Sequence, residues 1–250
     1  MIKNPNDIIE KLTSDCLSIF GDNLISMALF GSAVSHEYTP GVSEITTLIL
    51  ISDNSIASLY RYSSVFEAWS KQKVTLPIFL SGTSLKIFSQ INPVQLLDIQ
   101  SSYRIIYGED FINDLPIEQE FLRLDCLKLL DRLMVESKSK FIINNGRKKE
   151  LQNFLEFSIY EMLPLLKALL VLHGKKIPYA STEIISSVED LFGLGASVLS
   201  DIFYNIRNFK GDLGELYDKF ISVICLLERS IEESFSGRIP ITSDQYDFRK

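Results

Sequence analysis

The residues best suited to chemistry lie between Met27 and Ser52, where two apolar runs flank a polar loop. Gly31-Ser32 ends the first run, and Ser43-Glu44-Ile45-Thr46 leads into the second. A glycine at such a turn tolerates positive φ and has no Cβ, so the backbone can approach a phosphate closely. The Ser32 hydroxyl can donate a hydrogen bond to a phosphate oxygen. The segment therefore has the layout of a site for a phosphorylated ligand.

The second apolar run is predicted to be a strand that presents two polar side chains to this site. Alternate residues of a strand point to the same face, so Glu44 and Thr46 project together while Ile45 points into the core. A Gly-Ser pair alone is common in turns. The preceding strand and the spacing to Glu44 favour a binding site over an ordinary turn, because they place the Gly-Ser pair and the carboxylate at one end of a sheet.

These residues resemble the nucleotidyltransferase superfamily of the DNA polymerase beta type, in its small bacterial branch. The family pattern is Gly-Ser, a polar loop, Asp-x-Asp and a third carboxylate on a later strand. In the family, the carboxylates hold two magnesium ions that neutralise a triphosphate and activate an acceptor hydroxyl. This chain keeps Gly31 and Ser32, but Glu44 and Thr46 stand at the two aspartate positions.

The resemblance implies roles for particular residues. Val94–Ile99 is predicted to be the later strand, and Asp98 is its only charged residue. Asp98 is assigned as a metal ligand and the catalytic base, and Glu44 as the other metal ligand for Mg²⁺. Gly31, Ser32 and Ser43 are assigned to nucleotide binding. The Tyr-Gly-Glu-Asp sequence at 107–110 also resembles the end of the catalytic domain in this branch.

The two departures from the family pattern weaken the expected metal site. Glutamate can serve as a Mg²⁺ ligand, but its extra methylene shifts the metal or the strand by roughly 1 Å, which can cost about a hundredfold in rate. Threonine is the larger change, because a neutral hydroxyl cannot supply the charge that holds two divalent ions together. The sequence therefore predicts an impaired two-metal mechanism.

Composition argues against a nucleic-acid partner. The chain of 250 residues is 46% hydrophobic and 23% charged, which is an ordinary globular balance, and its net charge is −7. Attachment to a nucleic-acid backbone requires clustered Lys and Arg. Arg104 and the run Arg147–Lys149 are candidates for contact with a triphosphate, although the run also suits a solvated helix start.

The remaining composition favours a cytoplasmic protein without membrane contact. The first residues lack an apolar signal core, and no apolar run approaches the roughly 18 residues that span a bilayer. The three cysteines, Cys16, Cys126 and Cys225, lack the paired spacing of zinc sites and are predicted to be reduced thiols.

Hydrophobic periodicity predicts an α+β fold, in which an N-terminal mixed-sheet domain precedes a C-terminal all-α helical bundle. The resemblance implies that the first of these is a nucleotidyltransferase domain. The domain boundaries are expected at 1–115 and 116–236, followed by an extended tail at 237–250. The predicted helices of the first domain are 7–20, 55–70 and 85–88, and its strands are 24–30, 44–52, 74–80 and 94–99. The predicted helices of the bundle are 117–143, 147–173, 181–192, 196–209 and 213–234.

Three functions follow as hypotheses. The first is transfer of a nucleoside monophosphate from a nucleoside triphosphate to a hydroxyl of a small molecule or protein. The alternative is a catalytically degenerate relative that binds a nucleotide or a protein partner through the inherited cleft. A third hypothesis is a helical partner-binding protein that binds no nucleotide. Apolar surface on the bundle could also support a homodimer.

Overall fold

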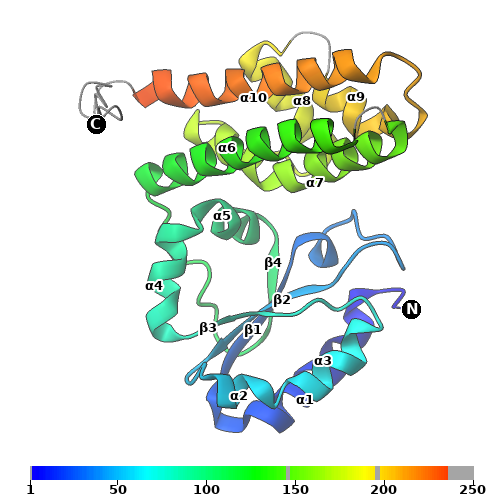
Figure 1. Cartoon of the computed structure of the whole chain (residues 1–250). Helices are drawn as coiled ribbons and strands as arrows, with labels where there is room; N and C mark the ends of the chain where they lie inside the picture. Colours follow the sequence, from blue (N-terminus) through cyan, green and yellow to red (C-terminus); the bar gives the residue numbers. More distant parts are fainter. Residues whose placement is uncertain (1, 145–146, 195–197, 236–250) are drawn as a thin grey trace, which may run out of the picture. The chain divides into compact units, whose positions relative to one another are not determined.

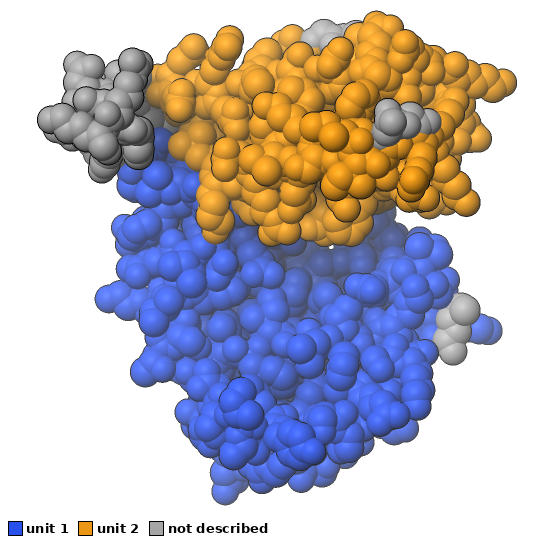
Figure 2. All heavy atoms as spheres, viewed as in Figure 1, with its two compact units in different colours: residues 1–125, 170–180 blue, residues 126–169, 181–250 orange. Residues whose placement is uncertain are grey.

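The computed structural model describes residues 2–144, 147–194 and 198–235. The chain divides into two compact units, which are coloured separately in Figure 2. Unit 1 comprises 1–125 and 170–180, and unit 2 comprises 126–169 and 181–250. The division falls at 125/126, within a long helix, rather than at 115/116. The second part of unit 1 begins in the last residues of the next long helix. The expected tail at 237–250 lies outside the described residues.

Unit 1 is built on a four-stranded mixed sheet with the order β3-β2-β1-β4 (Figure 1). β1 pairs antiparallel with both β2 and β4, whereas β2 and β3 are parallel. The strands are β1 (Leu24–Phe30), β2 (Thr46–Ile51), β3 (Ile78–Leu80) and β4 (Tyr103–Tyr107). The predicted mixed sheet is confirmed, although its fourth strand differs from the one expected.

Helices cover both faces of this sheet, because alternate residues of its strands are apolar on each side. Ile45, Ile49 and Ile51 pack in one core with residues of α1, α2 and α3. Leu48 and Leu50 pack in the other core with residues of α4 and α5. The helices are α1 (Ile9–Phe20), α2 (Ile56–Tyr60), α3 (Ser63–Ser70), α4 (Gly82–Ile91) and α5 (Pro93–Ser101). Short 3₁₀ turns are η1 (Pro5–Ile8), η2 (Gly21–Asn23) and η3 (Gly31–Val34).

The predicted strand at 94–99 is wrong, because these residues form helix α5. Pro93 occupies the first turn, where its fixed φ suits a helix and its missing N–H costs nothing. Val94, Leu96 and Ile99 are buried on the helix. A short apolar run does not distinguish a strand from a buried helix, which is why periodicity misled the prediction. The fourth strand is β4, which follows α5.

Two other elements are shorter than predicted. The helix expected at 55–70 is interrupted after Tyr60 and continues as α3. The strand expected at 74–80 is regular only from Ile78, although Val74 forms an isolated bridge with Ile45. Pro77 lies between the two parts and cannot donate a ladder hydrogen bond, which accounts for the interruption.

Unit 2 is all helical, as the periodicity predicts. Its longest helices are α6 (Gln119–Asn144, from Cys126 onward) and α7 (Lys148–Leu172, up to Leu169), and its others are α8 (Ser181–Phe192), α9 (Val198–Asn205), the 3₁₀ turn η4 (Ile206–Asn208) and α10 (Leu213–Phe235). On α10 the buried residues Phe220, Ile224, Leu227 and Ile231 recur every three or four positions, which is the stripe that a bundle helix buries.

Polar contacts join the shorter helices of unit 2 to α7 and to one another. Arg207 of η4 forms an ion pair with Glu156 of α7 at 2.7 Å. Glu189 of α8 accepts hydrogen bonds from the backbone and hydroxyl of Ser200 on α9. Within the described ranges, no helix is both long enough and apolar enough to cross a bilayer.

Candidate functional site

The Gly-Ser turn lies at one end of the strands, where β1 ends and β2 and β4 begin. We call this end of the sheet its edge. Phe30, the last residue of β1, pairs with Thr46 at the start of β2 and with Tyr103 at the start of β4. The chain therefore enters β2 and β4 on either side of the turn that begins at Gly31. The structure brings together two parts of the expected site, the Gly-Ser turn and the start of β2.

Gly31 is required for its backbone conformation. Its φ is +69°, and its N–H donates to the carbonyl oxygen of Ser102 at 3.1 Å. A Cβ at this position would lie 3.6 Å from Thr46 Oγ1, which is ordinary van der Waals contact. The glycine is therefore favoured by the left-handed backbone rather than by lack of space. Sequence reasoning missed Ser102, whose carbonyl fixes the turn to the end of α5.

Ser32 joins the turn to the segment that enters β2. Its hydroxyl donates to the backbone carbonyl of Glu44 at 3.3 Å, in an exposed position. This bond is longer than the usual O–H···O distance, so a phosphate oxygen could replace the carbonyl as acceptor at small cost. The geometry of Ser32 is compatible with the nucleotide-binding role that the sequence predicts.

Ser43 closes the loop between the turn and β2. Its hydroxyl accepts a hydrogen bond from the Thr39 N–H at 2.9 Å, and its own N–H donates to the Thr39 carbonyl at 2.9 Å. These two bonds give Ser43 a structural role in the loop. Its hydroxyl proton remains able to donate, so nucleotide binding by Ser43 stays a prediction.

The start of β2 presents its side chains as alternation requires. Ile45 is fully buried in the core beside α1–α3, whereas Glu44 is exposed and Thr46 is half-buried. Thr46 has the same strand parity as Leu48, which packs in the core beside α4 and α5. Within the described chain, no hydrogen bond or ion pair engages the Glu44 carboxylate. The Glu44 carboxylate can therefore bind a cation, including a metal ion that arrives bound to a phosphate.

Asp98 does not lie on a strand, because it belongs to helix α5. This helix packs on the sheet face to which Thr46 points, since Leu96 and Ile99 share a core with Leu48. Asp98 is half-buried and lies one helical turn before Ser102, whose carbonyl oxygen accepts the hydrogen bond from the Gly31 N–H. The proposed roles of Asp98 as metal ligand and base are compatible with this placement, but the residue belongs to a helix and not to the predicted strand.

The basic candidate Arg104 points away from Glu44. Arg104 pairs with Leu29, whose side chain lies in the core beside α1–α3, and paired residues of antiparallel strands share a face. Lys73 is a better-placed cation that sequence reasoning missed. It is exposed, and it adjoins Val74, which bridges to Ile45 next to Glu44. Only the pairing of two distant segments reveals it.

Lys73 has an unusual backbone conformation with a local cause. Its φ is +67°, the one positive value of a non-glycine residue in the described ranges. Lys73 N–H donates to the Ser70 carbonyl and Val74 N–H to the Trp69 carbonyl, which is the pattern of a left-handed helix end. The termination of α3 therefore determines where Lys73 emerges beside β2.

Tyr103, at the start of β4, is excluded as a base by its environment. Burial raises the pKa of Tyr103 to about 12, and a hydrogen bond from its hydroxyl to the Asp110 carboxylate, at 2.6 Å, adds to this shift. The hydroxyl therefore keeps its proton at neutral pH. Asp110 also accepts hydrogen bonds from the backbone N–H groups of Ile112 and Asn113, which orders the chain after β4.

A pair of Mg²⁺ ions does not fit the residues at this edge. The four strands carry no Asp or Glu, and the described residues contain no group of three or more His, Cys, Asp or Glu side chains that could hold a metal ion. At the second aspartate position, the Thr46 hydroxyl donates to the Phe30 carbonyl at 3.0 Å. A hydroxyl used in this way supplies no charge to a metal.

The mixed sheet, its Gly-Ser turn and the following helices form an α+β arrangement that is consistent with a nucleotidyltransferase fold. No family model matches the chain, and no curated protein matches it. Among solved structures, it is similar to the spectinomycin adenyltransferase AAD(9) from Enterococcus faecialis, crystallised with ATP and spectinomycin. The TM-score is 0.53 and the identity 15%, over 92% of this chain and 100% of that chain. The likeness confirms the predicted α+β fold.

Proposed function

We propose that unit 1 binds a nucleoside triphosphate at the sheet edge formed by Gly31, Ser32 and Glu44, in a nucleotidyltransferase-like site. The observation that carries this proposal is the left-handed turn at Gly31, which is fixed by Ser102 and joined through Ser32 to the start of β2. Such a turn exposes backbone and a hydroxyl to a phosphate without an intervening side chain. The complex of AAD(9) with ATP supports a triphosphate as the ligand.

The charges at this edge support triphosphate binding with a limited role for metal. Lys73 can neutralise part of the phosphate charge as a point cation. Glu44 can contact a single Mg²⁺ that arrives with the nucleotide, since Mg²⁺ usually relies on one or two carboxylates and on substrate phosphates. With one carboxylate at the start of β2 and a hydroxyl at the next family position, we expect binding to depend only weakly on Mg²⁺.

Nucleotidyl transfer is a second candidate function, favoured by the placement of α5. Asp98 comes from the helix that covers the face to which Thr46 points. In the transfer, an acceptor hydroxyl would form a bond to the α-phosphorus, the bond to the leaving pyrophosphate would break, and Asp98 would take the hydroxyl proton. The acceptor class would be a small molecule or a protein.

Variants at the edge test nucleotide binding. We expect Ser32→Ala and Lys73→Gln each to weaken binding of ATP about threefold to tenfold, because each removes one phosphate contact. Ser55→Ala is the matched control, since Ser55 is a serine of unit 1 that caps α2. Equal affinities of wild type and both edge variants would place the nucleotide elsewhere.

Label transfer from α-labelled ATP tests the second candidate. Spectinomycin is a suitable first acceptor, because it accompanies ATP in the AAD(9) structure. Label on spectinomycin or on the protein itself, lost in Asp98→Asn, would support transfer with Asp98 as the base. Binding of ATP without label transfer to either acceptor, in wild type and in Thr46→Asp, would favour a nucleotide-binding relative.

A further inference from the structure

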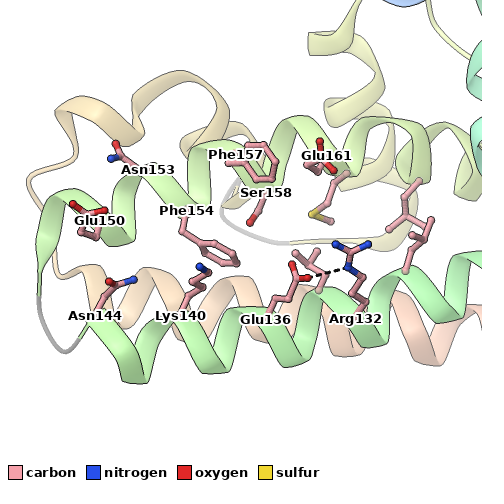
Figure 3. Close-up of a pocket in the computed structure, with 14 residues that line it drawn as sticks. Arg132, Glu136, Lys140, Asn144, Glu150, Asn153, Phe154, Phe157, Ser158 and Glu161 are labelled. Atoms are coloured by element: carbon pink, nitrogen blue, oxygen red, sulfur yellow. Dashed lines mark hydrogen bonds and ion pairs between the residues drawn. The ribbon is translucent and has the colours of Figure 1, made fainter. Parts of the chain in front are cut away.

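Unit 2 contains a cavity between α6 and α7 that the nucleotide site does not use (Figure 3). Its volume is about 590 Å³, within the range of roughly 300–1,000 Å³ that is typical of small-molecule sites. Its lining residues lie in the part of each helix that belongs to unit 2, so the cavity is complete within that unit. The cavity therefore has the size to hold a ligand of its own.

A buried hydroxyl in the cavity wall lacks a partner. Ser158 of α7 is only 2% exposed, and its Oγ makes no hydrogen bond to any residue that the structure describes. A buried hydroxyl without a partner is unfavourable, and a bound molecule with a donor or acceptor can satisfy it. Ser158 thus points to a polar atom on the occupant.

Apolar and aromatic side chains form much of the remaining wall. Leu133, Met162 and Leu165 are among the apolar lining residues. Phe154 extends from α7 toward α6 (Figure 3), and its ring stacks on Tyr217 with the centroids 6.3 Å apart. Phe157, which is 63% exposed, also lines the cavity. Two phenyl rings on a wall of aliphatic side chains suit a flat apolar body.

The charges in the wall are unequal at the end near Arg132. Arg132 pairs with Glu136 at 2.9 Å, as the dashed line in Figure 3 shows, and the carboxylate of Glu161 also acts on Arg132. Two carboxylates therefore face one guanidinium at this end. The other charged residues of the lining are Lys140 and Glu150. With three carboxylates and two cations in the lining, the cavity has a net charge of −1.

We propose that this cavity binds a small organic cation with a flat apolar body. The rings of Phe154 and Phe157 accept the flat body, and they attract a nearby cationic group electrostatically. Glu136 and Glu161 supply the excess negative charge, and the Ser158 hydroxyl accepts a hydrogen bond from the protonated amine. The cavity shares no residue with the proposed nucleotide site, since its lining lies in unit 2.

Three molecules of nearly equal shape test the proposal on the full chain: 2-naphthylmethylamine as the cation, 2-naphthylmethanol as the neutral form and 2-naphthoate as the anion. We expect the amine to bind about threefold or more tightly than the alcohol, and the carboxylate to bind most weakly. Calorimetry and naphthalene fluorescence measure the three affinities. Equal affinities, preference for the anion or no saturable binding of the amine would overturn the proposal.

Matched variants locate the binding. We expect Phe157→Ala and Glu161→Gln each to weaken amine binding about threefold, and Lys140→Gln to strengthen it by about the same factor. Tyr160→Ala is the control for Phe157→Ala, because Tyr160 is an exposed aromatic residue of α7 outside the cavity lining. Glu183→Gln on α8 is the control for Glu161→Gln. Equal effects of the lining variants and their controls would show that the amine binds elsewhere.

Discussion

The Thr46 hydroxyl donates a hydrogen bond to the Phe30 carbonyl oxygen, with 3.0 Å between the two oxygens. This bond joins the first residue of β2 to the last residue of β1, immediately before the Gly31 turn. The position that holds a metal-binding aspartate in the family that the sequence resembles is therefore used here to connect two strands. A carboxylate at this position would have no proton to donate.

The Thr46–Phe30 bond predicts that restoring the family carboxylate has a cost. We expect Thr46→Asp to lower the free energy of unfolding by about 1–2 kcal/mol, because the partly buried Phe30 carbonyl loses its donor and faces an anion. Thr46→Ser keeps the donor and should cost less. Urea unfolding of both variants measures the difference, and a Thr46→Asp protein as stable as wild type would contradict the structural role of the hydroxyl.

Three glycines should respond differently to alanine. Gly31→Ala places a side chain at φ +69° with adequate space, so we expect a loss of about 1–2 kcal/mol from backbone strain. Gly108→Ala should be worse, because its φ is +73° and a Cβ would collide with the Ile25 carbonyl oxygen. Gly82→Ala is the control, since a Cβ there meets nothing within 4 Å. Thermal unfolding that ranks these variants in another order would contradict the assigned conformations.

Lys73 offers a test that separates stability from ligand binding. Lys73→Gly should raise the free energy of unfolding by about 0.5–1 kcal/mol, because glycine adopts the left-handed conformation at the end of α3 without strain. The same change removes the cation beside Glu44, so binding of ATP should weaken. Lys73→Asn, which also tolerates this conformation, controls for glycine flexibility. A variant that is more stable but binds ATP unchanged would exclude Lys73 from the site.

The core beneath α1 predicts a loss of stability in alkali. Burial raises the pKa of Cys16 to about 12, with a smaller effect of Asp15, and burial also raises the pKa of Tyr62. Both groups are neutral when folded, whereas the unfolded chain releases their protons near the ordinary pKa values of 9.0 and 10.0. Their contribution is thus complete below about pH 9 and is lost as pH rises toward the folded values.

Tyr62→Phe isolates one part of this effect. The Tyr62 hydroxyl is buried and has no hydrogen-bond partner within the described residues, so its removal should leave stability at about pH 8 unchanged or higher by up to about 1 kcal/mol. Above pH 10 the variant should gain further relative to wild type, because one ionisation is gone. The same difference in free energy of unfolding between the two proteins at about pH 8 and at about pH 10.5 would contradict this explanation.

Local patterns were sufficient to predict much of the fold. β1 has the expected bounds, and α8 begins and ends where its periodicity predicts. The strand expected at 94–99 failed because Val94, Leu96 and Ile99 could be buried by a strand or by a helix. Only packing on the sheet distinguishes the two, and the N-terminal Pro93 was the local signal for the helix.

The site was predictable only where it is contiguous in sequence. Gly31, Ser32 and Glu44 are one short segment, and the structure joins them through the Ser32 hydroxyl. Lys73 and Ser102 reach the same edge through pairing with distant residues, for which the sequence holds no local signal. The structural role of Thr46 depends likewise on its partner across the ladder.

The measurement that tests the central claim most directly is titration calorimetry of the protein with ATP, GTP, CTP and UTP, each with and without Mg²⁺. The proposed site predicts saturable binding of at least one nucleotide, with a Kd that Mg²⁺ changes by less than about tenfold, since one carboxylate faces the phosphates. Failure of all four nucleotides to bind would contradict the nucleotide site, and binding that requires Mg²⁺ would contradict its reduced metal chemistry.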